Sequence, residues 1–232
     1  MVIARHSLLC IALLCSAAAW GQSRANEHTG AELQLPAKPA RIEPAPGGDW
    51  SQASRKGENS VWTRNVPGTP IKEVKLEAVV DAPIDQVWRT VTEIERYPEF
   101  MPYIDAIEVM HEHDENSAYV YHRVDPPLVS KRDYTLLIVN EVDPESGEHY
   151  RYWTQMNQFG PEPKEGVVRL VICDGSWALY PMEDGRTRAV YWVYTNPGGK
   201  IPTWLANKAN TSGLFDVIKA VEKRAQDLSW QS

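Results

Sequence analysis

The fold of this chain is decided by residues 213–228, which read GLFDVIKAVEKRAQDL. Counted from Leu214, the apolar residues recur at offsets of 3, 4, 7, 11 and 14, and this spacing places them in one stripe along a helix. The stripe consists of Leu214, Val217, Ile218, Val221, Ala225 and Leu228. Because an amphipathic helix must bury its stripe against another layer, we expect a long C-terminal helix, beginning near Pro202, that the rest of the chain covers.

The covering layer is predicted by the alternation of apolar and polar residues upstream of this helix. Residues 74–80 alternate as in a half-buried strand, and residues 84–94 have helical spacing, with Pro83 suited to the first turn. A loop over residues 97–103, which contains two prolines, ends this first helix. Further strands then follow at short intervals, over residues 104–111, 118–124, 133–142, 148–157, 166–173, 176–182 and 187–195. Connections this short imply antiparallel pairing.

Together these elements predict an α+β fold, in which a curved antiparallel β-sheet of about seven strands wraps around the long C-terminal helix. A sheet closed by one helix leaves room for an internal cavity, although the pattern does not require one. We divide the chain into a signal peptide (residues 1–21), a flexible N-terminal arm (residues 22–57) and one domain (residues 58–232). The arm is rich in Pro, Gly, Ala and charge and has no periodic apolar pattern.

The first 21 residues are typical of a secretory signal peptide. A basic start precedes the apolar residues 8–20, a run too short to span a bilayer, which takes about 20 residues. Ala19 and Gly21 are small residues at the two positions that matter for cleavage, so we expect cleavage before Gln22 and an exported protein, periplasmic or secreted. A lipoprotein signal with Cys15 acylated is the alternative, and it is disfavoured because no small residue precedes that cysteine.

Composition and charge exclude several classes of function. The chain has 24 basic and 31 acidic residues, a net charge of −7 that becomes −8 when Arg5 leaves with the signal peptide, so we expect no nucleic-acid partner. Of the 3 cysteines only Cys173 remains in the mature chain, and its apolar neighbours favour burial. His111 and His113 stand among acidic residues, which favours a solvated turn over a metal site. No phosphate loop or nucleophile elbow is present, and we expect no cofactor, no metal and no catalytic set.

Two groups of residues suggest a binding cavity. The chain has 9 Trp and 10 Tyr but only 3 Phe, and aromatic rings with one polar atom suit a cavity wall or an interface. The strand aromatics that would form either such a wall or a packed core are Trp153, Trp177, Tyr191, Trp192 and Tyr194. In the strand of residues 118–124, either His122 or Arg123 points inward, and the sequence leaves this choice open.

Four stretches resemble the START (StAR-related lipid-transfer) family of the helix-grip superfamily, also called SRPBCC. In order, they are residues 129–134 (VSKRDY), 166–169 (GVVR), 176–181 (SWALYP) and 194–205 (YTNPGGKIPTWL), within a resemblance that spans residues 61–228. Residues 96–102 (RYPEFMP) also resemble the ubiquinone-binding and polyketide-cyclase branches of the superfamily, which stay open as alternatives.

The resemblance implies a helix-grip fold around a lipid-sized tunnel, with the C-terminal helix and nearby loops as a gate. Gate candidates are residues 207–213 and the loop at Leu128 and Val129. The buried acid–base pair common in sterol-binding members is missing, because Ile138 occupies one of its two places. The resemblance gives Arg132 and Asp133 a structural role. Together with Trp153 from the aromatic set, the residues that we expect to contact ligand are His122, Arg123, Tyr134, Leu136, Ile138, Trp177, Val190, Trp192, Tyr194, Asn210, Leu214 and Val217.

We therefore expect an exported protein that binds or transfers one hydrophobic ligand without covalent chemistry. The ligand class is a sterol, phospholipid, fatty acid or other polycyclic or isoprenoid lipid, and the residues do not distinguish among these. We expect a monomer that contacts membranes transiently. A polyketide cyclase or aromatase with His122, Arg123 or Tyr134 as acid–base groups, a ubiquinone-binding chaperone, and an interaction module with a solid core are the alternatives.

Overall fold

The computed structural model describes residues 35–127, 129–199 and 201–227, without the side chains of residues 203–206 and 208–210. The predicted signal peptide and Cys15 lie outside the described residues, as do Leu128 of the gate loop and Leu228 of the helical stripe. In the part of the chain that the structure describes, no helix has both the length and the apolar character needed to cross a membrane.

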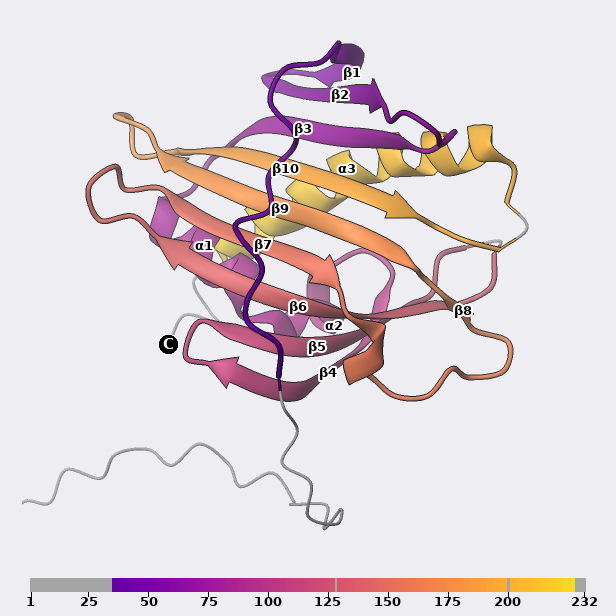
Figure 1. Cartoon of the computed structure of the whole chain (residues 1–232). Helices are drawn as coiled ribbons and strands as arrows, with labels where there is room; N and C mark the ends of the chain where they lie inside the picture. The colour runs from indigo at the N-terminus through magenta and orange to yellow at the C-terminus, as the bar shows by residue number, and fades with distance from the viewer. Residues whose placement is uncertain (1–34, 128, 200, 228–232) are drawn as a thin grey trace, which may run out of the picture. The chain divides into compact units, whose positions relative to one another are not determined.

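Within the described residues, ten strands form one sheet in the order β1-β2-β3-β10-β9-β7-β6-β5-β4, and the short β8 pairs with β6 (Figure 1). Neighbouring strands are antiparallel, except that β8 runs parallel to β6. The strands are β1 (Ser51–Lys56), β2 (Asn59–Asn65), β3 (Lys72–Val80), β4 (Ile104–Asp114), β5 (Ser117–Val124), β6 (Arg132–Val142), β7 (His149–Gln155), β8 (Val168–Arg169), β9 (Ile172–Pro181) and β10 (Thr187–Asn196).

The sheet has more strands than the alternation predicts. Strands β1 and β2 form a hairpin at one edge, and β1 lies within the predicted flexible arm. Its residues are mostly exposed, so an edge strand of this kind carries no apolar alternation to be recognised. The predicted strand over residues 166–173 is instead split into the two-residue β8 and the beginning of β9.

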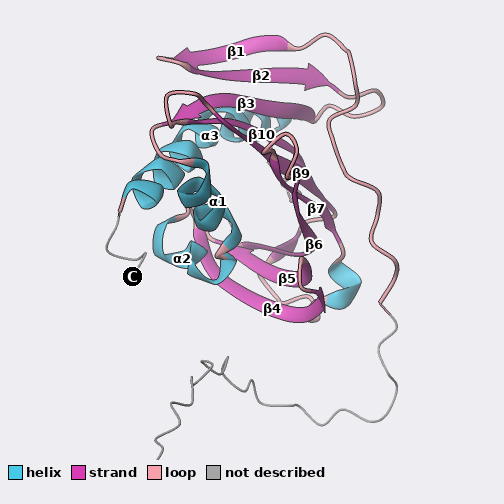
Figure 2. Cartoon of the chain, turned by 90° about the vertical axis from the view of Figure 1, so that its left-hand side faces the viewer, coloured by secondary structure: helices cyan, strands magenta, loops and turns pink. Residues whose placement is uncertain are grey.

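The helices lie on the concave side of the curved sheet (Figure 2). These are α1 (Ile84–Thr92), α2 (Tyr97–Phe100) and α3 (Thr203–Gln226), with the short 3-10 turn η1 (Ile94–Arg96) between α1 and α2. A second 3-10 turn, η2 (Asn157–Phe159), follows β7 and lies on the outer side of the sheet (Figure 2), where Phe159 contacts Tyr119. The stripe of α3 is buried as expected at Leu214, Ile218, Val221 and Ala225. These side chains share one apolar core with the inward residues of β3 and with α1, and they confirm the predicted fold class.

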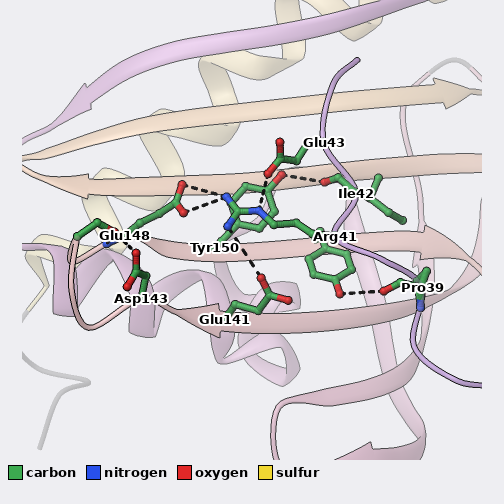
Figure 3. Close-up of polar contacts among 10 residues, drawn as sticks. Pro39, Arg41, Ile42, Glu43, Glu141, Asp143, Glu148 and Tyr150 are labelled. Carbon is green, nitrogen blue, oxygen red and sulfur yellow. Dashed lines mark hydrogen bonds and ion pairs between the residues drawn. The ribbon is translucent and has the colours of Figure 1, made fainter. Parts of the chain in front are cut away.

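A segment of the predicted arm, residues 37–50, crosses the outer face of the sheet (Figure 3). Arg41 pairs with Glu148 at 3.0 Å, and its guanidinium lies 3.4 Å from the centre of the Tyr150 ring. The Tyr150 hydroxyl donates to the carbonyl of Ile42 at 2.8 Å. These contacts join residues more than 100 positions apart, so no local sequence pattern predicts them.

A buried ion pair fastens β8 to the sheet. Asp133 on β6 is fully buried, and it accepts hydrogen bonds from Arg169 Nε at 2.7 Å and from the Tyr121 hydroxyl at 3.1 Å. Next to it, Arg132 donates to the carbonyls of Ser130 and Pro197. Both side chains therefore have structural contacts that connect the sheet to its loops.

Candidate functional site

A cavity of about 270 Å³ lies between the concave face of the sheet and the helices. Side chains alternate along a strand, so every second residue of β5, β6, β7, β9 and β10 faces this space. The described residues that line it are Ile94, Tyr97, Met101, Pro102, Ile104, His122, Val124, Tyr134, Leu136, Ile138, Arg151, Trp153, Leu170, Cys173, Trp177, Tyr191, Val193, Thr195 and Val217. The wall is mainly apolar and aromatic.

The structure brings many of the sequence-predicted site residues together in this wall. They are His122, Tyr134, Leu136, Ile138, Trp153, Trp177 and Val217. Leu214 is buried in the apolar core but does not line the cavity, and the side chain of Asn210 lies outside the described residues.

The choice between His122 and Arg123 is decided by the register of β5. His122 is 3% exposed and faces the cavity. Arg123 points to the other face, where its Nε pairs with Asp105 at 2.9 Å. Arg123 is therefore not part of the cavity wall.

The face of β10 that lines the cavity is the opposite of the one predicted, so three predicted site residues were assigned to the wrong face. Val190, Trp192 and Tyr194 were expected to face the tunnel. The cavity is lined instead by the alternate residues Tyr191, Val193 and Thr195. Tyr191 is the register partner of Trp177, which faces inward. Trp192 is nonetheless only 5% exposed. Because apolar residues are buried on both faces of β10, Ala189 on one and Trp192 on the other, hydrophobicity does not reveal which face is inside.

Aromatic contacts organise the wall. The Trp177 and Tyr191 rings stack at 4.2 Å, and Trp153 lies 5.9 Å from Tyr191. Gly175 makes room for Trp153, since a Cβ at that position would lie 2.3 Å from Trp153 Cζ2. The absence of a side chain at Gly175 therefore allows the indole to lie flat against β9.

The ionisable groups of the wall are neutral near pH 7, apart from one. Burial lowers the pKa of His122 to about 3, and its Nδ1 lies 3.2 Å from the carbonyl of Val120. Burial raises the pKa of the Cys173 thiol to about 12 and raises the pKa of the Tyr134 and Tyr191 hydroxyls. The ring of His122 stacks on that of Tyr134 at 5.1 Å.

The exception is Arg151 on β7, which the sequence reasoning missed. It is 3% exposed, and its Nη1 donates to Asn140 Oδ1 at 3.0 Å. Burial lowers the pKa of its guanidinium, but an arginine keeps its charge in proteins. The signal was available, because Arg151 shares a strand face with Trp153, two residues away.

The wall combines a mostly apolar surface with a few polar groups. None of the described lining residues is a carboxylate, and the thiol and phenols there are held in their protonated, less nucleophilic form. A mostly apolar cavity with a few placed polar groups is the usual form of a small-molecule binding site.

Comparison with known proteins gives matches over most of the domain. Residues 80–222 match a family model described as polyketide cyclase / dehydrase and lipid transport. The chain is 26% identical to the phosphatidylcholine transfer protein of Rattus norvegicus over 203 residues, which cover 85% of this chain and 90% of that protein. It is also 32% identical to an uncharacterised protein of Pseudomonas aeruginosa over 110 residues, 47% of this chain and only 54% of that relative.

Solved structures show the same fold. A STAR-related lipid transfer protein fragment from Xanthomonas axonopodis matches with a TM-score of 0.69 and 27% identity, over 77% of this chain and 99% of that one. Human StAR-related lipid transfer protein 5 matches with a TM-score of 0.72 at 17% identity, over 77% of this chain and 87% of that one.

Proposed function

The chain belongs to the polyketide cyclase / dehydrase and lipid transport family, and we propose that it is an exported lipid-binding protein that carries one hydrophobic ligand without chemical change. The observation that carries this proposal is the cavity of about 270 Å³, which has an apolar and aromatic wall and is covered by the helices. The volume lies just below the range of about 300–1,000 Å³ that is usual for ligand sites, which favours one small ligand. The lipid-transfer relatives support the same class of function.

The energetic benefit of such a cavity comes from the hydrophobic effect. A lipid that leaves a membrane exposes apolar surface to water, at about 2.5 kcal/mol for each 100 Å². An apolar wall removes most of that penalty by covering the surface. No bond needs to be made or broken, which agrees with a wall whose thiol and phenols stay protonated.

We also propose that the protein contacts membranes at one end of the sheet. Tyr103 is 49% exposed and Val171 is 65% exposed, and each is adjacent in sequence to a residue that lines the cavity, Pro102 and Leu170. Exposed apolar groups beside a cavity can enter the apolar part of a bilayer. Val142, which is 53% exposed at the other end of β6, offers a matched control.

Ligand extraction tests the binding proposal. The mature protein is purified without detergent, its bound lipids are extracted and identified by mass spectrometry, and uptake of fluorescent lipids is measured after delipidation. We expect Val217→Trp, which fills the cavity, to reduce uptake at least about 10-fold, and Lys219→Trp on the exposed side of the same helix to leave it unchanged. A ligand-free protein that takes up no lipid would refute the proposal.

Membrane contact and export have separate tests. In liposome flotation, the double variant Tyr103→Ser with Val171→Ser should bind less, whereas Val142→Ser should bind like the wild type. Equal loss in both variants would contradict the proposed contact end. Export is tested by fractionation and by N-terminal sequencing of the mature chain, which should begin at Gln22.

A further inference from the structure

Arg151 is the charged residue in the wall of a cavity that is otherwise neutral. The one hydrogen bond of its side chain within the described residues joins it to the neutral amide of Asn140, at 3.0 Å. No carboxylate of the described residues forms an ion pair with it. Its side chain is nevertheless removed from solvent, with 3% of the residue exposed.

Of the other largely buried arginines of the described chain, two pair with carboxylates, and Arg132 instead has two backbone carbonyl acceptors, against the single amide acceptor of Arg151. Arg169 pairs with the buried carboxylate of Asp133, and Arg64 pairs with Glu73. A buried cation without a counter-charge is costly, and an apolar side chain would be more stable at the same place. The position of Arg151 therefore needs an explanation that packing does not provide.

The surroundings of Arg151 indicate which kind of group could supply its missing counter-charge. In the sheet register Arg151 lies between Asn140 on β6 and Trp177 on β9. Its charge acts on Tyr97 and His122 across the cavity, opposing the effect of burial on the pKa of Tyr97 and adding to it for His122. Arg151 is itself one of the residues that line the cavity, so a ligand that occupies this space would lie against it.

We propose that Arg151 anchors the head group of the ligand, and that this ligand is an amphiphile with a single acidic head, either a carboxylate or a phosphate monoester. This inference rests on the lipid-binding function proposed above. The guanidinium fork matches both groups, because each offers two oxygens to two parallel N–H donors. The apolar tail then lies along Ile138 and Leu136, which continue the same wall.

The same arrangement disfavours other head groups. A quaternary ammonium would lie against the like charge of Arg151 in a space of low dielectric, where repulsion is strong. A neutral ester or alcohol would leave the guanidinium without a counter-charge. The small cavity volume, about 270 Å³, favours one acyl or isoprenoid chain over two.

Matched probes test the proposal on the delipidated mature protein. Binding of cis-parinaric acid is compared with binding of its methyl ester, which has the same chain and a neutral head. We expect the acid to bind at least about 10-fold more tightly. Competition then distinguishes the two acidic sources: monododecyl phosphate should displace the acid, and inorganic phosphate alone should not.

Two substitutions assign the preference to one side chain. Arg151→Met should abolish the preference for the acid over the ester, while Arg123→Met, on the outer face of β5, should retain the preference. Because Arg151→Met removes an unmatched buried charge, it should also raise the Tm of the ligand-free protein, by at least about 2 °C. A purely structural arginine would lower the Tm when replaced.

The possible failures are distinguishable. Binding of neither probe, nor of any other lipid, contradicts the proposed function and this inference together. Equal binding of acid and ester by the wild type overturns this inference and leaves the proposed function standing, as does an acid preference that survives in Arg151→Met. Displacement by inorganic phosphate alone assigns the site to a free anion and also overturns it. If Arg151→Met fails to fold, the wild-type comparison and Arg151→Lys, which keeps the charge but loses the fork, decide the question.

Discussion

Breaking the buried ion pair between Asp133 and Arg169 is expected to destabilise the domain strongly. Asp133 is fully buried and accepts three hydrogen bonds, from Arg169 Nε at 2.7 Å, from Arg169 Nη2 at 3.0 Å and from the Tyr121 hydroxyl at 3.1 Å. The substitution Asp133→Ala removes all three at once. It also leaves the guanidinium of Arg169, whose side chain is 15% exposed, without its counter-charge.

The magnitude follows from these contacts. A hydrogen bond to a charged group contributes about 1.5–3 kcal/mol, and breaking one side of a buried ion pair typically costs about 3–5 kcal/mol. Arg169 keeps one partner after the substitution, because its Nη2 also donates to the carbonyl of Pro161 at 3.0 Å. We therefore expect a loss near the lower end of that range, about 3 kcal/mol in the free energy of unfolding.

Urea unfolding, followed by tryptophan fluorescence, measures this loss. The matched control is the double variant Asp133→Ala with Arg169→Met, which leaves no unpaired cation and should recover to within about 2 kcal/mol of the wild type. A loss below about 1 kcal/mol in Asp133→Ala would refute the reasoning, as would single-variant losses that simply add in the double variant. Because Leu170 of the cavity wall donates to the carbonyl of Asp133 at 2.9 Å, the single variant should also exchange bound lipid faster.

Three further predictions concern the cavity wall and the long helix. Gly175→Ala should lower the free energy of unfolding, measured in urea, by about 1–3 kcal/mol, because the new Cβ would collide with Trp153. Gly213→Ala has open space around the new Cβ and should stabilise helix α3 by about 0.5–1 kcal/mol. Equal effects of the two substitutions would contradict both expectations. Cys173, with its thiol pKa raised to about 12 by burial, should resist alkylation at pH 8 in the native protein and react once it is unfolded in urea, and rapid native labelling would be inconsistent with this. Burial lowers the pKa of His122 to about 3, so between about pH 6.5 and pH 3 the unfolded chain binds a proton that the folded chain does not, and the free energy of unfolding should fall as the pH falls through this window. His122→Phe should reduce the slope of the free energy of unfolding against pH by up to about 1.4 kcal/mol per pH unit. An unchanged slope would count against a buried neutral imidazole.

The main architecture could be predicted because its signals are local. The stripe that contains Leu214 and Val221 repeats with the period of a helix, and β3 alternates with the period of a strand. Such periods are properties of neighbouring residues, and they survive without knowledge of the partner element. The edge strand β1 could not be predicted in this way, because its residues are mostly exposed and show no alternation of apolar and polar side chains.

The cavity wall was predictable only where the motif resemblance assigned the inward face of a strand correctly. The motif resemblance placed Tyr134, Leu136 and Ile138 in the wall, and the structure has them there. On β10 it placed Trp192 inward, whereas the structure places Tyr191 there, because apolar side chains are buried on both faces of that strand. A shift of one residue exchanges the two faces completely.

The sequence by itself determined that strands would wrap around one long helix, because the spacing of apolar residues along a helix or strand is a property of neighbouring residues. Only the tertiary structure decided which side chains meet inside. The strand pattern could place Arg151 on the same face as Trp153, but the significance of Arg151 comes from its burial in a cavity with no carboxylate partner among the described residues. A missing counter-charge depends on what every neighbouring strand contributes in space, and spacing along one chain does not contain that information.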